Sequence, residues 1–159
     1  MSAKPDEFRA IIRPMRADDL DAVLRVEQNA YRFPWSRGIF SDCLIAGYQS
    51  VVLDQASSVL GYGIMSVAAA EAHILNICVD VSLRRRGLGR QLLEGLMQRA
   101  AAMRVERLFL EVRPSNLEAV GLYESSGFTV LGIRKNYYKA EDGREDALVF
   151  VREISSIKY

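Results

Sequence analysis

The 159-residue chain carries 21 Lys and Arg residues against 20 Asp and Glu residues, and half of its residues are hydrophobic. This charge balance argues against broad nucleic-acid binding, and no stretch approaches the roughly 18 uninterrupted apolar residues of a membrane-spanning helix. Two cysteines and one histidine are too few for a disulfide framework or a zinc site. We expect one domain over residues 10–154, between a polar tail at residues 1–9 and a short tail at residues 155–159. Because the first tail lacks the apolar core of a signal peptide, a cytoplasmic location is expected.

The first third of the chain predicts one strand followed by two helices. Residues 10–14 form the strand, and a helix follows from Asp19 to about Tyr31, capped by Asp18. Residues 33–36, Phe-Pro-Trp-Ser, break this helix, and Ser36 can cap a second, shorter one. The apolar positions expected to face inward are Leu20, Val23, Leu24, Ile39, Phe40, Cys43 and Leu44. The aromatic residues at the break are either part of the core or one wall of a substrate pocket.

Three strands and a long helix are predicted next. The strands cover residues 49–53, 59–67 and 72–79, with a polar turn at residues 55–58 between the first two. Apolar residues then recur at helical spacing, at Leu88, Leu92, Leu96, Ala100 and Met103. A strand therefore leads into the loop at residues 84–89, and this loop leads into a helix.

The loop itself has the sequence Arg84-Arg85-Arg86-Gly87-Leu88-Gly89. Two glycines two residues apart allow a tight turn that leaves main-chain N–H groups uncovered, and the next helix points its positive end at the same place. Such a loop suits a phosphate or a pyrophosphate; the alternative is a solvated basic turn. It is not a Walker loop, which would need Lys followed by Ser or Thr after the second glycine, and it lacks the third glycine of a Rossmann loop.

The remainder of the chain predicts a strand, a helix and two further strands. Residues 107–112 form the strand, and Ser115 with Glu118 makes a capping box for a helix that ends at about Ser126. Gly127 is the expected C-terminal stop of this helix. Strands at residues 128–134 and 147–154 follow, separated by a polar loop around residues 142–146. The whole pattern predicts an α/β fold with a mixed sheet and helices on both faces.

Four residues are candidates for chemistry: Cys78, Glu111, Asn116 and Tyr123. Glu111 is a carboxylate inside an apolar strand, so it is either a candidate proton acceptor, or the partner of Arg113 or Arg85, or a residue on an exposed face. Asn116 and Tyr123 lie seven residues apart and share one helix face, so one can hold a ligand while the other donates a proton. The alternative for Tyr123 is packing. Cys78 is a poor nucleophile because no second histidine exists to activate it.

The ordered set of strand, Arg84-x-x-Gly87-x-Gly89 loop, helix, strand with Glu111, and then Asn116 to Tyr123 resembles the GNAT family of N-acetyltransferases. The resemblance implies a single-domain GNAT fold with a mixed, mostly antiparallel central sheet. Within the family, the chain is most similar to the bacterial branch that acetylates the N-terminal alanine of the small-subunit ribosomal protein numbered eighteen. The stretches that carry this closer resemblance are 33–36, 76–80, 110–113, 122–125, 136–138 and 142–147.

The resemblance also implies roles for individual residues. Acetyl-CoA would be bound by Ile77, Cys78, Val79, Arg84, Arg85, Arg86, Gly87, Leu88, Gly89 and Asn116. Glu111 matches the family's proton acceptor and Tyr123 its proton donor. No metal is implied. Cys78 and Pro114 depart from the usual pattern without touching a proposed side-chain role, whereas Ala70 and His73 beside Glu71 stand where relatives often present more acidity.

The expected reaction is acetyl transfer to a protein N-terminal α-amine by direct attack, without an acyl-enzyme. The expected partner is a protein or peptide N-terminus, most plainly that of a ribosomal protein, with no direct contact to nucleic acid or membrane and with a monomer favoured. Two alternatives stay open: an acetyltransferase of the same fold that acts on a small amine or on other N-termini, and an acetyl-CoA-binding module without catalysis.

Overall fold

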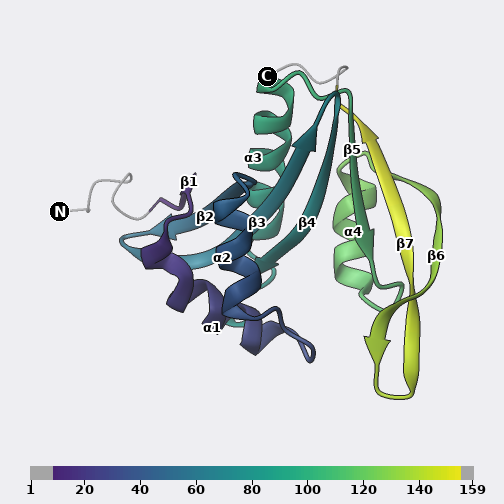
Figure 1. Ribbon diagram of the computed structural model, residues 1–159, viewed down its shortest axis with the longest axis horizontal. Coiled ribbons are helices and arrows are strands. Elements are labelled where there is room, and N and C mark those ends of the chain that lie inside the picture. The colour runs from purple at the N-terminus through teal and green to yellow at the C-terminus, as the bar shows by residue number, and fades with distance from the viewer. Residues whose placement is uncertain (1–8, 155–159) are drawn as a thin grey trace. The chain divides into compact units, whose positions relative to one another are not determined.

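The computed structural model describes residues 9–154, and Figure 1 shows their helices and strands. Seven strands form one sheet in the order β1 (Ile11–Pro14), β2 (Gln49–Gln55), β3 (Ser58–Ala68), β4 (Glu71–Val79), β5 (Arg107–Val112), β7 (Gly143–Glu153) and β6 (Thr129–Ala140). The helices are α1 (Leu20–Ala30), α2 (Arg37–Ile45), α3 (Leu88–Ala102) and α4 (Leu117–Ser125), with short 3-10 turns η2 (Ala17–Asp19) and η3 (Val81–Leu83). β4 pairs with β5 in parallel, whereas β1–β2, β2–β3, β5–β7 and β6–β7 are antiparallel. The predicted mixed, mostly antiparallel α/β sheet is confirmed.

The chain forms two compact units, and the first contains residues up to 65 together with residues 76–96. Here helices cover both faces of β3, because neighbouring residues of a strand point to opposite sides. The ring of Phe40 on α2 meets the ring of Tyr62 on β3 with centroids 5.4 Å apart. On the other face, a Cβ added to Gly63 would lie 2.8 Å from the Leu96 side chain of α3, so the missing side chain is what lets this helix approach.

The second unit contains residues 66–75 and the chain from residue 97 onward. The first half of β4, Glu71–Ile74, runs beside Arg107–Leu110 of β5, and β7 and then β6 continue the sheet. Helix α4 packs on this sheet through Tyr123, whose ring lies 6.0 Å from that of Phe150 on β7. The packing fixes α4 against the strand pair that carries Glu111.

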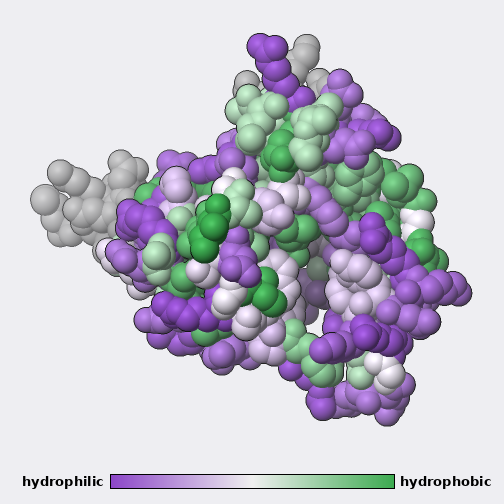
Figure 2. Space-filling view, viewed as in Figure 1, coloured by the Kyte–Doolittle hydropathy of each residue, from purple (hydrophilic) through white to green (hydrophobic). Residues whose placement is uncertain are grey.

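The hairpin of β6 and β7 is longer than the sequence predicted. The polar loop expected around residues 142–146 is wrong, since β6 runs to Ala140 and β7 begins at Gly143. Asn136 adopts φ 54° where the register shifts, and its N–H donates to the Asp146 carboxylate at 2.9 Å. Polar residues can fill both strands because β6 is an edge strand. Figure 2 shows hydrophobic surface along the β6 side of the molecule, and Val130, Leu131 and Ile133 are each more than half exposed.

Two of the four predicted helix boundaries agree with the structure. Ser36 accepts the N–H of Ile39 and Gly127 adopts φ 91° after α4, so both predictions are confirmed. Asp18 does not cap α1, because η2 precedes that helix. Ser115 is not the cap of α4 either; Asn116 takes this place, and its side chain accepts the N–H of Ala119 at 3.2 Å.

The predicted tails, residues 1–9 and 155–159, lie outside the described residues apart from Arg9. Within the described part, no helix combines the length and the apolar character that crossing a membrane requires.

Candidate functional site

The predicted phosphate loop lies between η3 and α3 in the first unit. Asp80 caps η3, accepting the N–H of Ser82 at 2.9 Å and its hydroxyl at 2.7 Å, and these hydrogen bonds hold the pKa of Asp80 below its usual value. The backbone is then left-handed at Arg85 (φ 64°) and at Gly87 (φ 77°). The turn ends where the N–H of Gln91 donates to the Gly87 carbonyl at 3.1 Å. Successive main-chain N–H groups in such a turn point toward one side and form an anion-binding concavity.

The main-chain N–H groups and the arginine side chains of this loop are uncommitted, meaning that they have no partner within the described residues. Within residues 9–154, the main-chain N–H groups of Arg84–Gly89 donate to no protein acceptor, and the side chains of Arg84, Arg85 and Arg86 form no ion pair. All three arginines are exposed. The first amides of α3 add the positive end of a 15-residue helix. These donors and charges fit a phosphate or a diphosphate.

The strand that leads into this loop carries Ile77, Cys78 and Val79 at its end. The carbonyl of Ile77 accepts the hydroxyl of Tyr31 at 3.2 Å. Cys78 is buried, and burial raises the pKa of its thiol to about 11. A thiol with this pKa stays protonated near neutral pH, and only the thiolate is a good nucleophile. Cys78 therefore contributes packing and main chain to this unit.

Sequence analysis missed a buried carboxylate in the same unit. Glu27 of α1 has an exposed fraction of 2%, yet it is hydrogen-bonded on both oxygens. It accepts the hydroxyl of Tyr62, the Asn76 amide at 2.9 Å and the main-chain N–H of Trp35 at 2.9 Å. Through these bonds Glu27 fixes the start of the loop between α1 and α2 relative to β4. Glu27 follows Leu20 by seven residues and Val23 by four, which places it on the apolar face of the helix. A carboxylate on that face was the signal in the sequence that could have identified it.

Glu111 lies on β5 in the second unit, opposite Val149 of β7. Its side chain is 6% exposed, so the expected burial is confirmed and the exposed-face alternative is wrong. The ion-pair alternative also names the wrong partners. Glu111 Oε1 lies 3.3 Å from Nε of Arg134, and Oε2 bonds to Nε2 of His73. Arg113 pairs with Glu145 instead, at 3.2 Å.

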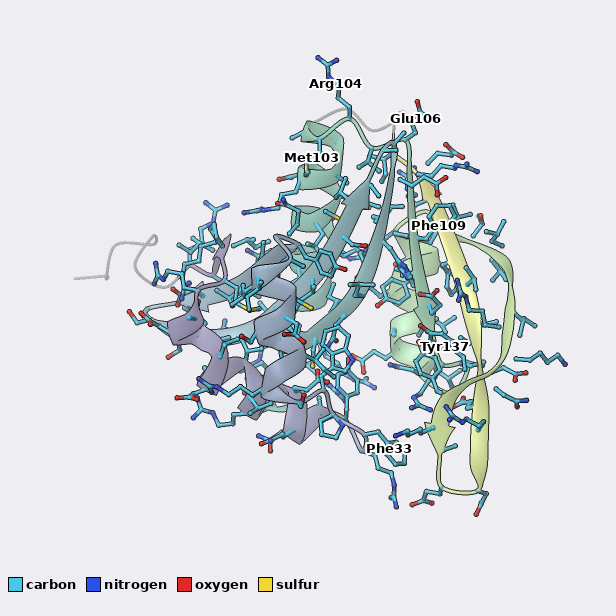
Figure 3. All side chains as sticks on the ribbon, viewed as in Figure 1. Phe33, Met103, Arg104, Glu106, Phe109 and Tyr137 are labelled. Carbon is cyan, nitrogen blue, oxygen red and sulfur yellow. The ribbon has the colours of Figure 1, made fainter. Side chains whose placement is uncertain are left out.

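Aromatic residues from β6 lie around Glu111. Figure 3 labels Tyr137 on β6 and Phe109 on β5. Tyr137 and Tyr138 meet at a centroid distance of 4.8 Å, and the Arg113 guanidinium lies 4.4 Å from the ring centre of Tyr138. Burial, followed by the charge of Glu111, raises the pKa of Tyr137, and the pKa of Tyr138 rises for the same causes together with its neighbour Tyr137. Both phenols therefore stay neutral at ordinary pH.

Tyr123 is 6% exposed on α4 and is held by ring packing on two sides. Its ring lies 5.9 Å from that of Phe128 and 6.0 Å from that of Phe150. Ring packing therefore fixes the position of Tyr123 within the second unit. The charges of Glu111 and Tyr123 both contribute to the raised pKa of Tyr138.

Asn116 caps α4, and the residue before it, Ser115, is held by Glu145 of the distant strand β7. Glu145 of β7 accepts the N–H of Ser115 at 3.1 Å and its hydroxyl at 3.0 Å, and it pairs with Arg113. The serine hydroxyl and N–H, with the arginine, keep the pKa of Glu145 low. Because Asn116 uses Oδ1 to cap the helix, its Nδ2 is the group with which its side chain can donate to a ligand.

The predicted site residues thus fall into two groups. Ile77–Val79 and Arg84–Gly89 belong to the first unit, whereas Glu111, Asn116 and Tyr123 belong to the second. Among residues 9–154, no cluster of three or more His, Cys, Asp or Glu side chains has the geometry to hold a metal ion.

Comparison with known proteins gives a consistent result. The model of the acetyltransferase (GNAT) family matches residues 15–128. The chain is 42% identical over 144 residues to the [ribosomal protein bS18]-alanine N-acetyltransferase of Escherichia coli, which covers 91% of this chain and 97% of that relative.

Solved structures agree with the sequence comparison. The crystal structure of the ribosomal-protein-S18-alanine N-acetyltransferase from Escherichia coli superposes with a TM-score of 0.86 at 38% identity, covering 95% of this chain and all of that one. The structure of yncA from Salmonella typhimurium, solved with its cofactor acetyl-CoA, shares the fold with a TM-score of 0.79 at 16% identity, over 95% and 97% of the two chains.

Proposed function

The chain belongs to the acetyltransferase (GNAT) family, and from this premise we propose that it transfers the acetyl group of acetyl-CoA to the N-terminal alanine of ribosomal protein bS18. The observation that carries the proposal is the 42% identity to an enzyme of that name over nearly the full length of both chains. The presence of Glu111, Asn116, Tyr123 and the arginine and glycine loop supports it further.

The coenzyme would bind to main-chain donors more than to side chains. The uncommitted N–H groups of Arg84–Gly89 and the start of α3 suit the diphosphate, with the three exposed arginines adding positive charge. Main-chain groups of Ile77–Val79 would hold the thioester arm, and Nδ2 of Asn116 would donate a further hydrogen bond. A site built in this way tolerates side-chain variation but depends on the backbone conformation of the loop.

The acceptor amine must be neutral when it attacks. An α-amino group has a pKa near 8, so about a tenth to a quarter of it is already neutral near pH 7. Glu111 would take the remaining proton, and a main-chain N–H of Ile77–Val79 would donate to the oxygen that becomes negative in the transition state. Tyr123 would then give its proton to the CoA thiolate as the carbon–sulfur bond breaks.

This sequence of steps requires no covalent enzyme intermediate. The one cysteine near the loop, Cys78, has a raised thiol pKa and is buried, which supports direct attack by the amine. Direct attack predicts that no acetylated protein forms when acetyl-CoA is supplied without an acceptor.

The proposal is tested by incubating the protein with acetyl-CoA and a set of peptides that differ only in the first residue. Peptides that begin with Ala, Ser, Met or an acetylated Ala are compared with intact bS18, and masses and thiol release are measured. The expected result is one acetyl group on the α-amine of the Ala peptide and of bS18, and none on the blocked peptide. Acetylation of lysine side chains, or of small amines alone, would overturn the assigned acceptor, and binding without thiol release would indicate a non-catalytic module.

A further inference from the structure

His73 shares one face of the sheet with Glu111. In the parallel pairing of β4 and β5, His73 lies opposite Phe109, and Glu111 follows two residues later on β5. Residues two apart on a strand point to the same side, which brings the His73 ring over the carboxylate. Nε2 of His73 accordingly bonds to Oε2 of Glu111. This contact is unassigned in the mechanism described above.

The carboxylate of Glu111 has few ways to release a proton. Its side chain is 6% exposed, and each oxygen has a partner: His73 at Oε2 and Arg134 at Oε1, 3.3 Å away. An acceptor that gains a proton in each turnover must lose it before the next one. The guanidinium of Arg134 has no lone pair with which to accept it.

The imidazole of His73 contacts both Glu111 and solvent, and it can accept and release a proton. Its side chain is 32% exposed, so one part of the ring meets solvent while Nε2 meets Glu111. A neutral imidazole can accept a proton on one nitrogen while the other nitrogen releases one.

We propose that His73 is the proton-transfer partner of Glu111, through which the proton taken from the acceptor amine leaves for solvent. The inference rests on the proposed function, because it needs Glu111 as proton acceptor. The proton passes from the α-ammonium group to Glu111 and then from its carboxyl O–H to Nε2 of His73. The ring releases its Nδ1 proton to water at the same time, so one proton enters as one leaves. Rotation of the ring then brings Nε2–H to water, where Nε2 loses its proton and Nδ1 takes one up, and this restores the first tautomer.

Other charged and titratable groups also surround this pair. The guanidinium groups of Arg134 on β6 and of Arg113, the residue after β5, have no lone pair with which to accept a proton, and the pKa values of Tyr137 and Tyr138 on β6 are raised above 10. Glu71 and Arg107, at the far ends of the paired segments, are about half exposed and pair with each other at 3.4 Å. Among these neighbours, His73 is the one that bonds to Glu111 and has a nitrogen able to accept its proton.

The test compares His73→Gln with His73→Ala in the full-length protein. Glutamine places an amide nitrogen near the position of Nε2 and keeps a hydrogen bond to Glu111, but it cannot pass a proton on. At saturating acetyl-CoA and peptide, we expect kcat to fall about tenfold or more in both variants, below the full effect of removing a general base. We also expect the dependence of kcat on pH to differ from that of the wild type and added imidazole to restore part of the rate of His73→Ala.

Arg134→Gln is the matched control, because it alters the partner of the other Glu111 oxygen and should keep the shape of the wild-type pH profile. Thermal unfolding and acetyl-CoA binding of every variant are measured alongside, since a purely structural role would move these and not the pH profile. A wild-type kcat and pH profile in His73→Gln would overturn the inference. So would a double variant in which His73→Gln lowers kcat of Glu111→Gln by the same factor as it lowers kcat of the wild type. A wild-type protein that acetylates no peptide would instead overturn the proposed function, so the two failures are distinguishable.

Discussion

The main-chain N–H of Phe128 donates to the carbonyl of Tyr123 at 3.0 Å, and the N–H of Gly127 donates to the carbonyl of Glu124 at 3.1 Å. This pair of bonds closes the C-terminus of α4 in the manner of a Schellman motif, with Gly127 in the left-handed conformation. The backbone of Tyr123 is therefore fixed independently of its ring. Its hydroxyl can be removed without disturbing the end of the helix.

For this reason Tyr123→Phe isolates the role of the hydroxyl. The aromatic contacts to Phe128 and Phe150 remain, so we expect thermal unfolding and acetyl-CoA affinity to change little. If Tyr123 protonates the leaving thiolate, kcat should fall by about a hundredfold or more. Steady-state kinetics of thiol release measures this, with the exposed Tyr48→Phe as control. A near-wild-type kcat would show that the Tyr123 hydroxyl takes no part in the reaction and that the ring contributes packing alone.

Glu111→Gln tests the proton acceptor. The amide retains the volume and one acceptor oxygen of the carboxylate but cannot take a proton. We expect kcat near neutral pH to fall by about a hundredfold to ten-thousandfold. The loss should shrink as the pH rises above 8, where the amine of the acceptor is neutral in solution.

Glu106→Gln provides the control for that experiment. Glu106 is exposed and lies one residue before β5, so its substitution changes the charge of the protein equally without touching the buried carboxylate. A pH profile of Glu111→Gln that parallels the wild type at every pH would contradict the assigned role.

Gly87→Ala tests the phosphate loop separately from the fold. Gly87 has φ 77° and an added Cβ would meet no atom within 4 Å, so the substitution costs only the left-handed backbone, about 1 to 2 kcal/mol. Gly47 has φ 75° and the same open surroundings, which makes Gly47→Ala a matched control. Both variants should lose similar stability, and only Gly87→Ala should lose acetyl-CoA affinity by calorimetry. Equal affinities in the two variants would remove Gly87 from the coenzyme site.

The ion pair between Arg13 and Asp19 predicts how the free energy of unfolding depends on pH. The Asp19 side chain is 8% exposed and accepts two hydrogen bonds of 2.8 Å from the Arg13 guanidinium. The hydrogen bonds from Arg13 hold the pKa of Asp19 below its ordinary value of 3.8. Because the folded state binds the proton less tightly, the stabilisation is complete above the unfolded pKa and is lost as pH falls through the folded pKa.

We therefore expect the free energy of unfolding to be level from pH 5 to 7 and to fall below about pH 4. Urea unfolding across this range measures it. Asp19→Asn should be less stable than the wild type at pH 7 and should lose less stability on acidification. The same slope in both proteins would show that Asp19 does not supply this dependence.

Local features of the fold were predictable from sequence because neighbouring residues determine them. Ser36 and Gly127 were recognisable as helix boundaries, and the alternation in residues 72–79 identified β4. The resemblance to the acetyltransferase family is likewise confirmed by the family match. Asn116 displaced Ser115 as a cap because Glu145, thirty residues away along the chain, holds the serine hydroxyl and N–H.

The surroundings of the candidate site were not predictable in the same way. Which side chains reach Glu111 depends on the register of β5 against β4 and on the course of β6, and His73 and Arg134 are 38 and 23 residues distant in sequence. Glu27 was missed for a related reason, since the three groups that donate to it come from the α1–α2 loop, β3 and β4. Pairing across the fold, not local propensity, decides these contacts.

The central claim is that the main-chain amides of Arg84–Gly89 hold the diphosphate of the coenzyme. The most direct measurement follows the amide signals of ¹⁵N-labelled protein while acetyl-CoA is added. We predict that the signals of Arg85–Gly89 shift in a saturable manner and that a nucleoside diphosphate alone moves the same signals more weakly. Unchanged signals in this loop at a concentration of acetyl-CoA that supports turnover would contradict the account.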